Sequence, residues 1–346
     1  MNVLNLIREN IKSMQPYASA RDEFTESTSD MVFLDANENP FNNGLNRYPD
    51  PQQQEVKKML SEMKAVSTEN ILLGNGSDEV LDLIFRAFCE PNKDNIIILP
   101  PTYGMYKVLA DINAIDVIEV QLTSDFQPKT QTILLAANEK SKLLFLCSPN
   151  NPTGNSFSRV QVEIVLRQFK GIVVIDEAYI DFSVQESWLN CLEEFPNLII
   201  TQTLSKAYGM AGIRLGVCYA SKEVIAVLNS IKPPYNVNEL SQLKALERLS
   251  NIKEVQNEIE QIKNQKEILL KELKEVVFIE QIYPSDANFL LIKVDNATER
   301  YEQLIEKGIV VRNRSNQPLC ENCLRISVGT AEENTQLIKV LKRLNK

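Results

Sequence analysis

The chain has 346 residues, 44% of them hydrophobic and 24% charged, and its formal net charge is −9. This is the composition of a globular protein long enough for one large and one smaller domain. The acidic balance argues against nucleic-acid binding, which needs clustered basic side chains. No apolar run reaches the length of a membrane span, and the N-terminus lacks a signal peptide's apolar segment, so we expect a cytoplasmic protein that acts on small molecules.

The sequence contains six cysteines and no histidine. Without histidine, Ser-His-Asp and Cys-His machinery is excluded, so any general base must be a lysine, tyrosine, cysteine or carboxylate. The scattered cysteines favour reduced thiols over a disulfide framework. Cys320 and Cys323 form a C-x-x-C pair, but the chain offers neither a histidine nor a second close pair to complete a zinc site. We therefore expect no bound metal.

The first 45 residues are expected to form an N-terminal arm that packs with the smaller domain and with a second subunit. Residues 1–34 open with apolar residues at helical spacing, and residues 34–40 and 46–51 are loops rich in Asn, Asp and Pro. Two such loops so early suggest a segment that crosses the mouth of an active site. They could also simply connect elements, and their composition leaves both interpretations open.

Residues 46–240 are expected to form the large domain, because short apolar runs there alternate with polar clusters and helical patterns. Apolar strands separated by helices predict a mostly parallel sheet with helices on both faces. Ligands of such sheets bind beyond the carboxyl ends of the strands, where each polar cluster falls. The predicted strands are Ile71–Leu73, Ile96–Leu99, Leu143–Leu146, Ile172–Ile175 and Leu198–Ile200.

The stretch after the last of these strands, residues 203–216, combines a lysine, hydroxyls, glycines and an arginine. A lysine beyond a buried strand end can be partly desolvated, which lowers its pKa and lets the neutral amine condense with an aldehyde. Lys206 is the candidate for this role. Ser205 and Arg214 beside it could bind the phosphate of such a cofactor. An isolated lysine would more often cap a surface turn, so the interpretation depends on the other clusters.

Those clusters contain the groups that pyridoxal phosphate needs. Asp176, the first polar residue after its strand, could keep the pyridine nitrogen protonated. Residues 76–78, Gly-Ser-Asp, open a predicted helix whose backbone N–H groups could bind the phosphate together with Ser205 and Arg214. The cofactor ring could stack on Tyr103, and its phenolic oxygen could accept hydrogen bonds from Asn151 and Tyr179. Each signal is weak alone, and their order along successive strands makes them specific.

Residues 241–346 are expected to form a smaller α+β domain. A charged helical region spans about Glu239–Val276, and strands are predicted at Ala287–Val294, Ile309–Arg312 and Leu324–Val328. A helix is expected at about Thr298–Lys307. Thr330 and Glu333 have the spacing of a capping box that opens a last helix.

Four motifs resemble those of the fold-type I aminotransferases: S-P-N-N-P-T-G (148–154), D-E-A-Y (176–179), S-K-A-Y-G-M-A-G-I-R-L-G (205–216) and L-R-I-S-V-G (324–329). Further motifs are similar to the histidinol-phosphate aminotransferases in particular: L-D-A-N-E-N-P (34–40), N-R-Y-P-D-P (46–51), G-N-G-S-D-E (74–79), P-T-Y-G-M-Y (101–106), P-Y-N-V (234–237), A-N-F-L (287–290) and V-R-N-R (311–314). The resemblance covers about residues 16–330. It implies an α/β fold, with a mostly parallel seven-stranded sheet sandwiched by helices in the large domain.

The resemblance assigns roles to individual residues. Lys206 corresponds to the lysine that binds pyridoxal phosphate and moves the proton, Asp176 to the partner of the pyridine nitrogen, and Tyr179 and Asn151 to the ligands of the phenolic oxygen. The stacking ring corresponds to Tyr103, and the phosphate ligands to Ser77, Asp78, Ser205 and Arg214. A tyrosine that reaches the neighbouring subunit's cofactor corresponds to Tyr48, which implies a homodimer with shared sites. On the substrate side, Arg325 corresponds to the arginine that binds the substrate α-carboxylate. Arg312 and Tyr17 correspond to residues near the substrate's own phosphate, and Asn151 is a further substrate-binding position.

The activity implied by the resemblance is transfer of an amino group between L-histidinol phosphate and 2-oxoglutarate, giving imidazole-acetol phosphate and glutamate. A decarboxylase of threonine phosphate is the first alternative, because it would share every cofactor residue. An aminotransferase of aromatic amino acids is a second. A cofactor-binding gene regulator is disfavoured, since the roughly thirty residues before the first motif leave no room for a DNA-binding domain.

Overall fold

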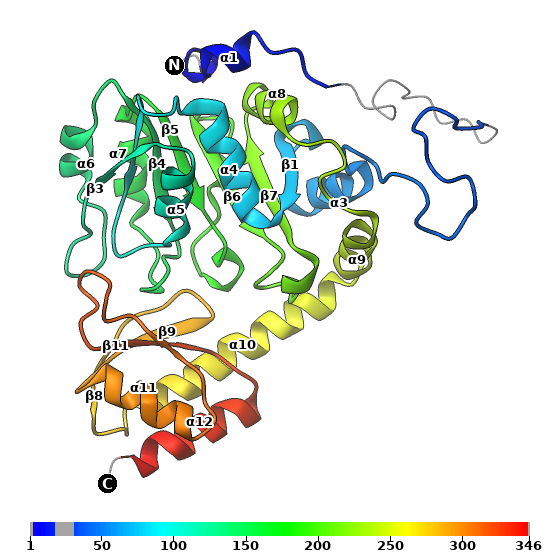
Figure 1. The fold of residues 1–346 in the computed structure, drawn as a ribbon. Helices are drawn as coiled ribbons and strands as arrows, with labels where there is room; N and C mark the ends of the chain where they lie inside the picture. The colour runs from blue at the N-terminus through cyan, green and yellow to red at the C-terminus, as the bar shows by residue number, and fades with distance from the viewer. Residues whose placement is uncertain (1–2, 18–30, 345–346) are drawn as a thin grey trace.

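The computed structural model describes residues 3–17 and 31–344. Within these residues a seven-stranded sheet with the order β1-β7-β6-β5-β4-β2-β3 forms the large domain (Figure 1). Neighbouring strands are parallel except at β7, which runs antiparallel to both β1 and β6. The strands are β1 (Ile71–Asn75), β2 (Asn95–Ile98), β3 (Asp116–Glu119), β4 (Ser141–Cys147), β5 (Ile172–Asp176), β6 (Leu198–Thr203) and β7 (Leu215–Ala220). All five predicted strands are confirmed.

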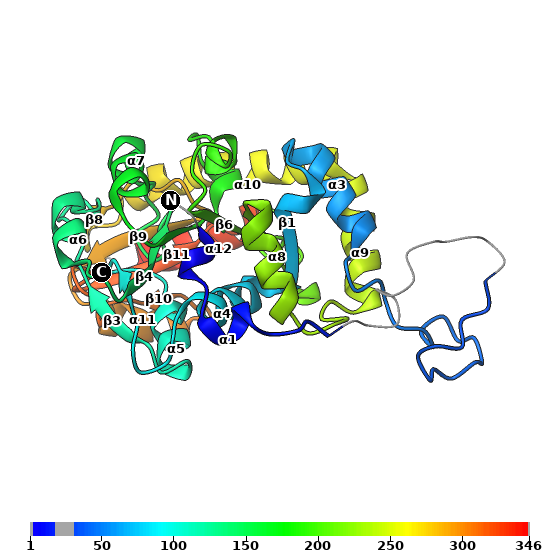
Figure 2. The ribbon, with the colours of Figure 1, turned by 90° about the horizontal axis from the view of Figure 1, so that it is seen from above.

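Helices cover both faces of this sheet, as the apolar strands require (Figure 2). One face packs against α4 (Gly76–Phe88), α5 (Met105–Ile112) and α8 (Lys222–Ile231). The other packs against α3 (Gln54–Lys64), α6 (Thr130–Ala136), α7 (Arg159–Gln168) and the short helices η3 (Ile180–Phe182) and η4 (Trp188–Cys191). Alternate residues of each strand enter the two cores: Val174 faces α4, whereas Val173 and Ile175 face the opposite layer.

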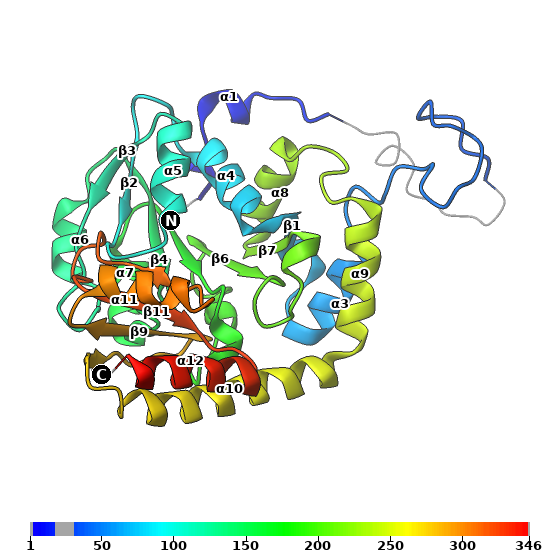
Figure 3. The same cartoon turned by 60° about the horizontal axis from the view of Figure 1, so that its bottom comes forward.

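The smaller domain contains a four-stranded antiparallel sheet of the described residues, with the order β10-β11-β9-β8 (Figure 3). Its strands are β8 (Ile279–Ile282), β9 (Phe289–Val294), β10 (Arg312–Asn313) and β11 (Cys323–Ser327). One face of the sheet packs against α10 (Ile252–Leu273), α11 (Ala297–Glu306) and α12 (Ala331–Arg343). The opposite face turns towards the large domain, because Phe289 and Leu291 belong to that domain's core.

Two predictions for this half of the chain need correction. The charged helical region is two helices, α9 (Glu239–Ser250) and α10, which are separated at Asn251. The strand predicted at Ile309–Arg312 begins only at Arg312, because Val310 is exposed and the ladder with β11 starts at the pair Arg312 and Arg325. The capping box of Thr330 and Glu333 at the start of α12 is confirmed.

The start of the arm packs on the large domain, not on the smaller domain as expected. In η1 (Val3–Leu6) and just before α1 (Glu9–Lys12), Val3 and Ile7 join the core between α4 and α8. The two apolar side chains pack among residues of α4 and α8, and Arg8 N donates a hydrogen bond to Ala87 O at 3.1 Å. Residues 31–45 extend away from the body of the chain (Figure 1). Residues 18–30 of the expected arm lie outside the described residues.

A short η2 (Thr68–Asn70) precedes β1, and η5 (Ala211–Ile213) precedes β7. None of the described helices is both long and apolar enough to cross a membrane. The carboxyl ends of β4, β5 and β6 and the strands β10 and β11 of the smaller sheet contribute residues to one cavity.

Candidate active site

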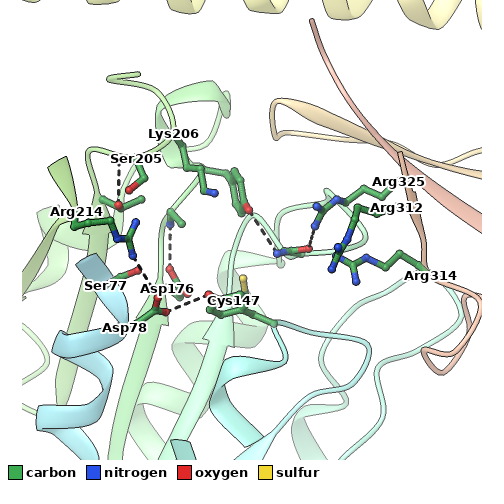
Figure 4. A pocket seen from close by; sticks show the side chains of 15 residues that line it. Ser77, Asp78, Cys147, Asp176, Ser205, Lys206, Arg214, Arg312, Arg314 and Arg325 are labelled. Carbon is green, nitrogen blue, oxygen red and sulfur yellow. Dashed lines mark hydrogen bonds and ion pairs between the residues drawn. The ribbon is translucent and has the colours of Figure 1, made fainter. Parts of the chain in front are cut away.

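A cavity of about 420 Å³ lies where the carboxyl ends of β4, β5 and β6 face the smaller domain. It is lined by side chains from both domains (Figure 4). The predicted site residues that it brings together are Ser77, Asp78, Tyr103, Asn151, Asp176, Tyr179, Ser205, Lys206, Arg214, Arg312 and Arg325. Tyr17 and Tyr48 do not line it.

Lys206 lies in the loop after β6 and points into the cavity (Figure 4). Its Nζ is 5.8 Å from the centroid of the Tyr179 ring. Burial by the cavity walls and the positive charge of Arg325 lower the pKa of the Lys206 amine, while the carboxylate of Asp176 opposes the shift. A larger fraction of the amine is therefore neutral, and only the neutral amine attacks an aldehyde.

Asp176 ends β5 at the floor of the cavity and is only 3% exposed. Its Oδ2 accepts a hydrogen bond from the Tyr106 hydroxyl at 2.7 Å, and its Oδ1 accepts one from Ala178 N at 3.2 Å. No ion pair to this carboxylate is found within residues 3–17 and 31–344. Burial raises its pKa, and the hydrogen bond from Tyr106 opposes that shift. The site thus holds a buried carboxylate without a cation, which a protonated ring nitrogen would complete.

The start of α4 forms the second part of the site. No side chain caps the first turn of this helix, so its backbone N–H groups are available to an anion. Strand β7 runs directly against the turn: a Cβ on Gly216 would lie 2.2 Å from Ser77 N. Gly76 has a φ of +77°, and a Cβ there would lie 2.6 Å from Nη2 of Arg214. Glycine at 216 therefore allows β7 to approach the start of α4, and glycine at 76 allows the positive φ and the approach of Arg214.

Asp78 organises the same corner. Its Oδ1 accepts a hydrogen bond from the Tyr103 hydroxyl at 3.1 Å, and its Oδ2 lies 3.6 Å from Arg214 Nη2. Ser205 lines the same cavity, and its backbone is fixed by a hydrogen bond from Ser205 N to Thr203 Oγ1 at 3.1 Å. Burial, with the negative charge of Asp78, raises the pKa of Tyr103, so its hydroxyl stays protonated. These contacts hold a cation, hydroxyls and free amides together, which is the donor set that a phosphate ester needs.

A polar chain links the two domains across the cavity. Arg325 Nη1 donates to Asn151 Oδ1 at 2.5 Å, and Asn151 Nδ2 donates to the Tyr179 hydroxyl at 3.5 Å. Phe289 supports both ends, with its ring 5.1 Å from the Tyr179 ring and 5.2 Å from Arg325 Cζ. Arg325 of the smaller domain is therefore placed relative to the large domain by one amide side chain.

The sequence interpretation missed several lining residues: Arg314, Cys147, Thr203 and Ala178. It also assigned no role to Tyr106, which does not reach the cavity but binds Asp176. The motif containing Tyr103 already included Tyr106 one helical turn later, and that spacing is the signal that could have identified it. The corresponding signal for Arg314 is its position two residues after Arg312, on the same side of an extended segment.

Tyr48 and Tyr17 lie apart from their own chain's cavity. The Tyr48 ring stacks on Tyr235, with 4.5 Å between centroids and 16° between planes, and half of the Tyr48 surface is exposed. Tyr17 is 75% exposed near the end of the first described segment. Their roles in cofactor and substrate binding stay predictions.

Replacing Tyr106 by phenylalanine should weaken the site without disturbing its packing, because the ring stacks on Phe145 at 4.7 Å between centroids and the variant keeps that contact. Loss of the hydrogen bond to Asp176 should cost about 1.5–3 kcal/mol of the free energy of unfolding. We expect kcat about threefold to tenfold lower, since the carboxylate becomes a poorer partner for a ring cation. Steady-state kinetics and thermal unfolding of Tyr106→Phe test this, and a variant equal to wild type in both would remove Tyr106 from the site.

The family model described as aminotransferase class I and II matches residues 22–341. This chain belongs to the class I and II aminotransferases. Among its relatives in this family, a histidinol-phosphate aminotransferase of Flavobacterium johnsoniae is 65% identical, covering 99% of both chains. Another, of Christiangramia forsetii, is 63% identical over 99% of this chain and 98% of its own.

Solved structures of the family share this aminotransferase's fold. The histidinol-phosphate aminotransferase of Clostridium acetobutylicum matches with a TM-score of 0.80 at 24% identity, covering 87% of this chain and 91% of its own. The fold-type I architecture expected from the motifs is thereby confirmed, with its mostly parallel seven-stranded sheet among the described residues and its separate smaller sheet.

Proposed function

We propose that this aminotransferase uses pyridoxal phosphate, bound with its ring nitrogen at Asp176 and its phosphate at the start of α4. The observation that carries the proposal is the buried Asp176 carboxylate, which has two hydrogen-bond donors but no cation among the described residues. Lys206 would bind the aldehyde covalently. Ser77, Ser205 and Arg214 would hold the phosphate, Tyr103 would stack on the ring, and Asn151 and Tyr179 would donate to the phenolic oxygen.

Pyridoxal phosphate supplies an electron sink that stabilises negative charge at the substrate carbon bearing the amino group. Asp176 keeps the proton on the ring nitrogen, on which this electron withdrawal depends. Lys206 would act as the base that takes the proton from the substrate carbon bearing the amino group, and its conjugate acid would return that proton to complete the transfer. Its lowered pKa suits this work, because a base is most effective when its pKa lies near the working pH.

We propose that the substrates are L-histidinol phosphate and 2-oxoglutarate, with imidazole-acetol phosphate and glutamate as products. The support is the name shared by the full-length relatives at 63–65% identity. The cavity fits this pair, since one substrate carries a phosphate and the other two carboxylates, and arginine guanidinium groups bind both anions. The relatives' names favour this reaction over decarboxylation of threonine phosphate and over transfer from aromatic amino acids.

The test is the first half of the reaction, followed by absorbance. Purified enzyme carrying its cofactor is mixed separately with histidinol phosphate, threonine phosphate and phenylalanine, without an acceptor. Histidinol phosphate should convert the cofactor to its amine form at the highest kcat/KM. Release of CO2 from threonine phosphate, or fastest conversion by phenylalanine, would instead support one of the alternatives.

We further propose a cytoplasmic homodimer in which Tyr48 reaches the partner's cofactor phosphate. Apolar side chains of the arm that are exposed in the described part of the chain support a second subunit: Val32, Leu34 and Phe41 are all at least 80% exposed. Tyr48→Phe should then weaken cofactor binding several-fold while leaving the fold intact, with the apparent Kd read from cofactor titration of the stripped enzyme. Sedimentation should give a dimer, and a fully active monomer would contradict the proposal.

A further inference from the structure

Three arginines form one wall of the cavity, across from the corner that contains Arg214, Ser205 and Ser77 (Figure 4). Arg312 and Arg325 were expected there, and Arg314 was not. The side chains of Arg312 and Arg314 make no ion pair with a carboxylate within residues 3–17 and 31–344. Nε of Arg314 and Nε of Arg325 are buried there without a hydrogen-bond partner. A buried donor without an acceptor costs free energy. These two N–H groups therefore indicate a site for a ligand whose oxygen atoms accept hydrogen bonds.

The backbone places these side chains on one surface. Arg312 of β10 lies directly opposite Arg325 of β11, so both point to the same face of the sheet. Arg314 follows two residues later, and its N–H donates to Cys323 O at 2.8 Å, which continues the ladder. Leu324 and Ile326 pack against the helices of the smaller domain, so Arg325 between them faces the cavity. Alternation along the strands accounts for all three orientations.

A tight turn fixes Arg314 from behind. Cys323 N donates to Cys320 O at 3.0 Å, and Asn322 in this turn has a φ of 56°. Both cysteines are fully buried, and they belong to the hydrophobic core that includes Phe289 and Leu291. The buried C-x-x-C pair therefore anchors the backbone on which Arg314 lies, through the bond from Arg314 N to Cys323 O. Because that backbone is fixed before a ligand binds, binding has to order mainly the arginine side chain.

The charges identify the kind of ligand. Lys206, Arg214 and the three arginines of the wall line the cavity, against only the carboxylates of Asp78 and Asp176. Burial, together with the positive charges of Arg325 and Arg312, lowers the pKa of Arg314 to about 10. The positive charges of the three arginines therefore repel one another, and a bound anion reduces this repulsion. One carboxylate group can be bound by Arg325 alone, whereas a doubly charged group uses additional arginines.

Arg312 and Arg325 already match substrate-binding residues through the family resemblance. We propose that Arg314 adds a further contact to the phosphomonoester dianion of the substrate, and that this contact strengthens the preference of this enzyme for a doubly charged phosphate over a singly charged group. The inference rests on the proposed function and extends it to a residue that neither the motifs nor the relatives' names assign. Arg314 acts as a specificity residue, because it lies on the substrate side of the cavity, away from Lys206 and Asp176.

The test compares Arg314→Gln with wild type in both half-reactions. For histidinol phosphate we expect KM to rise about tenfold to a hundredfold, because one charge-assisted contact is lost. We expect kcat to stay within about threefold of wild type. For glutamate, kcat/KM should change less than about threefold. Arg314→Lys keeps the positive charge but loses the planar guanidinium that can donate two parallel hydrogen bonds. Its KM for histidinol phosphate should therefore lie between those of wild type and Arg314→Gln. Arg343→Gln, the same charge removal at the exposed end of α12, should match wild type.

A pH series separates ligand binding from a merely structural role. A phosphomonoester loses its second proton near pH ~6, so at lower pH the ligand carries a single charge. The ratio of kcat/KM between wild type and Arg314→Gln should therefore be largest above pH ~7 and shrink towards pH ~5.5. Inorganic phosphate, as a competitive inhibitor of the glutamate half-reaction, should bind wild type more tightly than the variant by a similar factor.

The possible failures are distinguishable. If wild type does not convert histidinol phosphate at all, the proposed function fails. If wild type converts it and Arg314→Gln does so with the same KM, the role of Arg314 is refuted while the proposed function stands. A variant that loses glutamate and histidinol phosphate equally, with a ratio independent of pH, would also refute the phosphate assignment.

Discussion

Lys206→Ala should lower kcat by a factor of about 10⁴ or more, because it removes both the covalent attachment of the cofactor and the base that moves the proton. The protein should still fold, since Lys206 is exposed at the cavity and is not part of the hydrophobic core formed by the described residues. Cofactor should still bind through the phosphate corner, but without a covalent link. The measurements are single-turnover kinetics with histidinol phosphate and the absorption spectrum of bound cofactor.

Lys57→Met is the matched control for this experiment. Lys57 of α3 is also a buried lysine, and burial together with the positive charge of Lys232 lowers its pKa to about 8. It lies outside the cavity, so its replacement should leave kcat within about threefold of wild type. If Lys206→Ala kept more than about a hundredth of wild-type kcat, a lysine base at this position would be excluded.

Asp176→Asn should lower kcat about 10²- to 10³-fold, the usual cost of removing one preorganised charge from a water-excluded site. The side chain keeps its shape, and asparagine can still accept a hydrogen bond from Ala178 N. The change is therefore mainly electrostatic: a neutral amide no longer holds the proton on the ring nitrogen. Cofactor binding should persist because the phosphate corner is unchanged. Kinetics near wild type would refute the pairing of Asp176 with a ring cation.

Asp176→Asn should lower activity but raise the stability of the cofactor-free protein relative to wild type at neutral pH. Burial raises the pKa of Asp176 in the folded state, so ionisation of this carboxyl group favours the unfolded state. Below the ordinary carboxyl pKa of about 4 the group is protonated in both states and contributes nothing. As pH rises above that value, wild type loses free energy of unfolding and the asparagine variant does not. Chemical denaturation of both cofactor-free proteins at pH ~4 and pH ~7 should show the variant gaining relative stability.

Much of the large domain could be predicted because its strands and helices are visible in the local pattern of apolar and polar residues. Strands buried on both faces have to be continuously apolar, and each of the five predicted runs, such as Ile172–Ile175, is. The position of the site followed from the rule that ligands bind beyond the strand ends, and Lys206, Asp176 and Asn151 do lie there. Their individual roles were first inferred from the chemistry of the residues, and the resemblance to a family then assigned the same roles.

Other features depend on contacts that no local pattern reveals. Strand β7 was not predicted, because its run follows the lysine loop and its small residues, such as Gly216, are set by the approach of the α4 start. Tyr106 reads as a core aromatic on a helix, and only the fold shows that its hydroxyl lies 2.7 Å from Asp176 Oδ2. Arg314 needs the register between β10 and β11 to be known before it can be placed.

The arm illustrates a different difficulty. Its first residues have enough apolar surface to pack on the nearest groove, which is on the large domain. Residues 31–45 are mostly exposed, with Leu34 and Phe41 among them. The conformation of such an exposed segment depends on the partner surface that it packs against. The sequence of a single chain does not identify that surface directly. Tyr48 follows this segment, and so its expected role depends on the second subunit.

The most direct test of the account is to identify the lysine that carries the cofactor. The enzyme is saturated with pyridoxal phosphate, the link is reduced with borohydride, and the digested protein is analysed by mass spectrometry. We predict one pyridoxyl group per chain, on the peptide that contains Lys206, and its loss in Lys206→Ala. A label on Lys57 or another lysine in the wild-type enzyme, with Lys206 unmodified, would contradict the account.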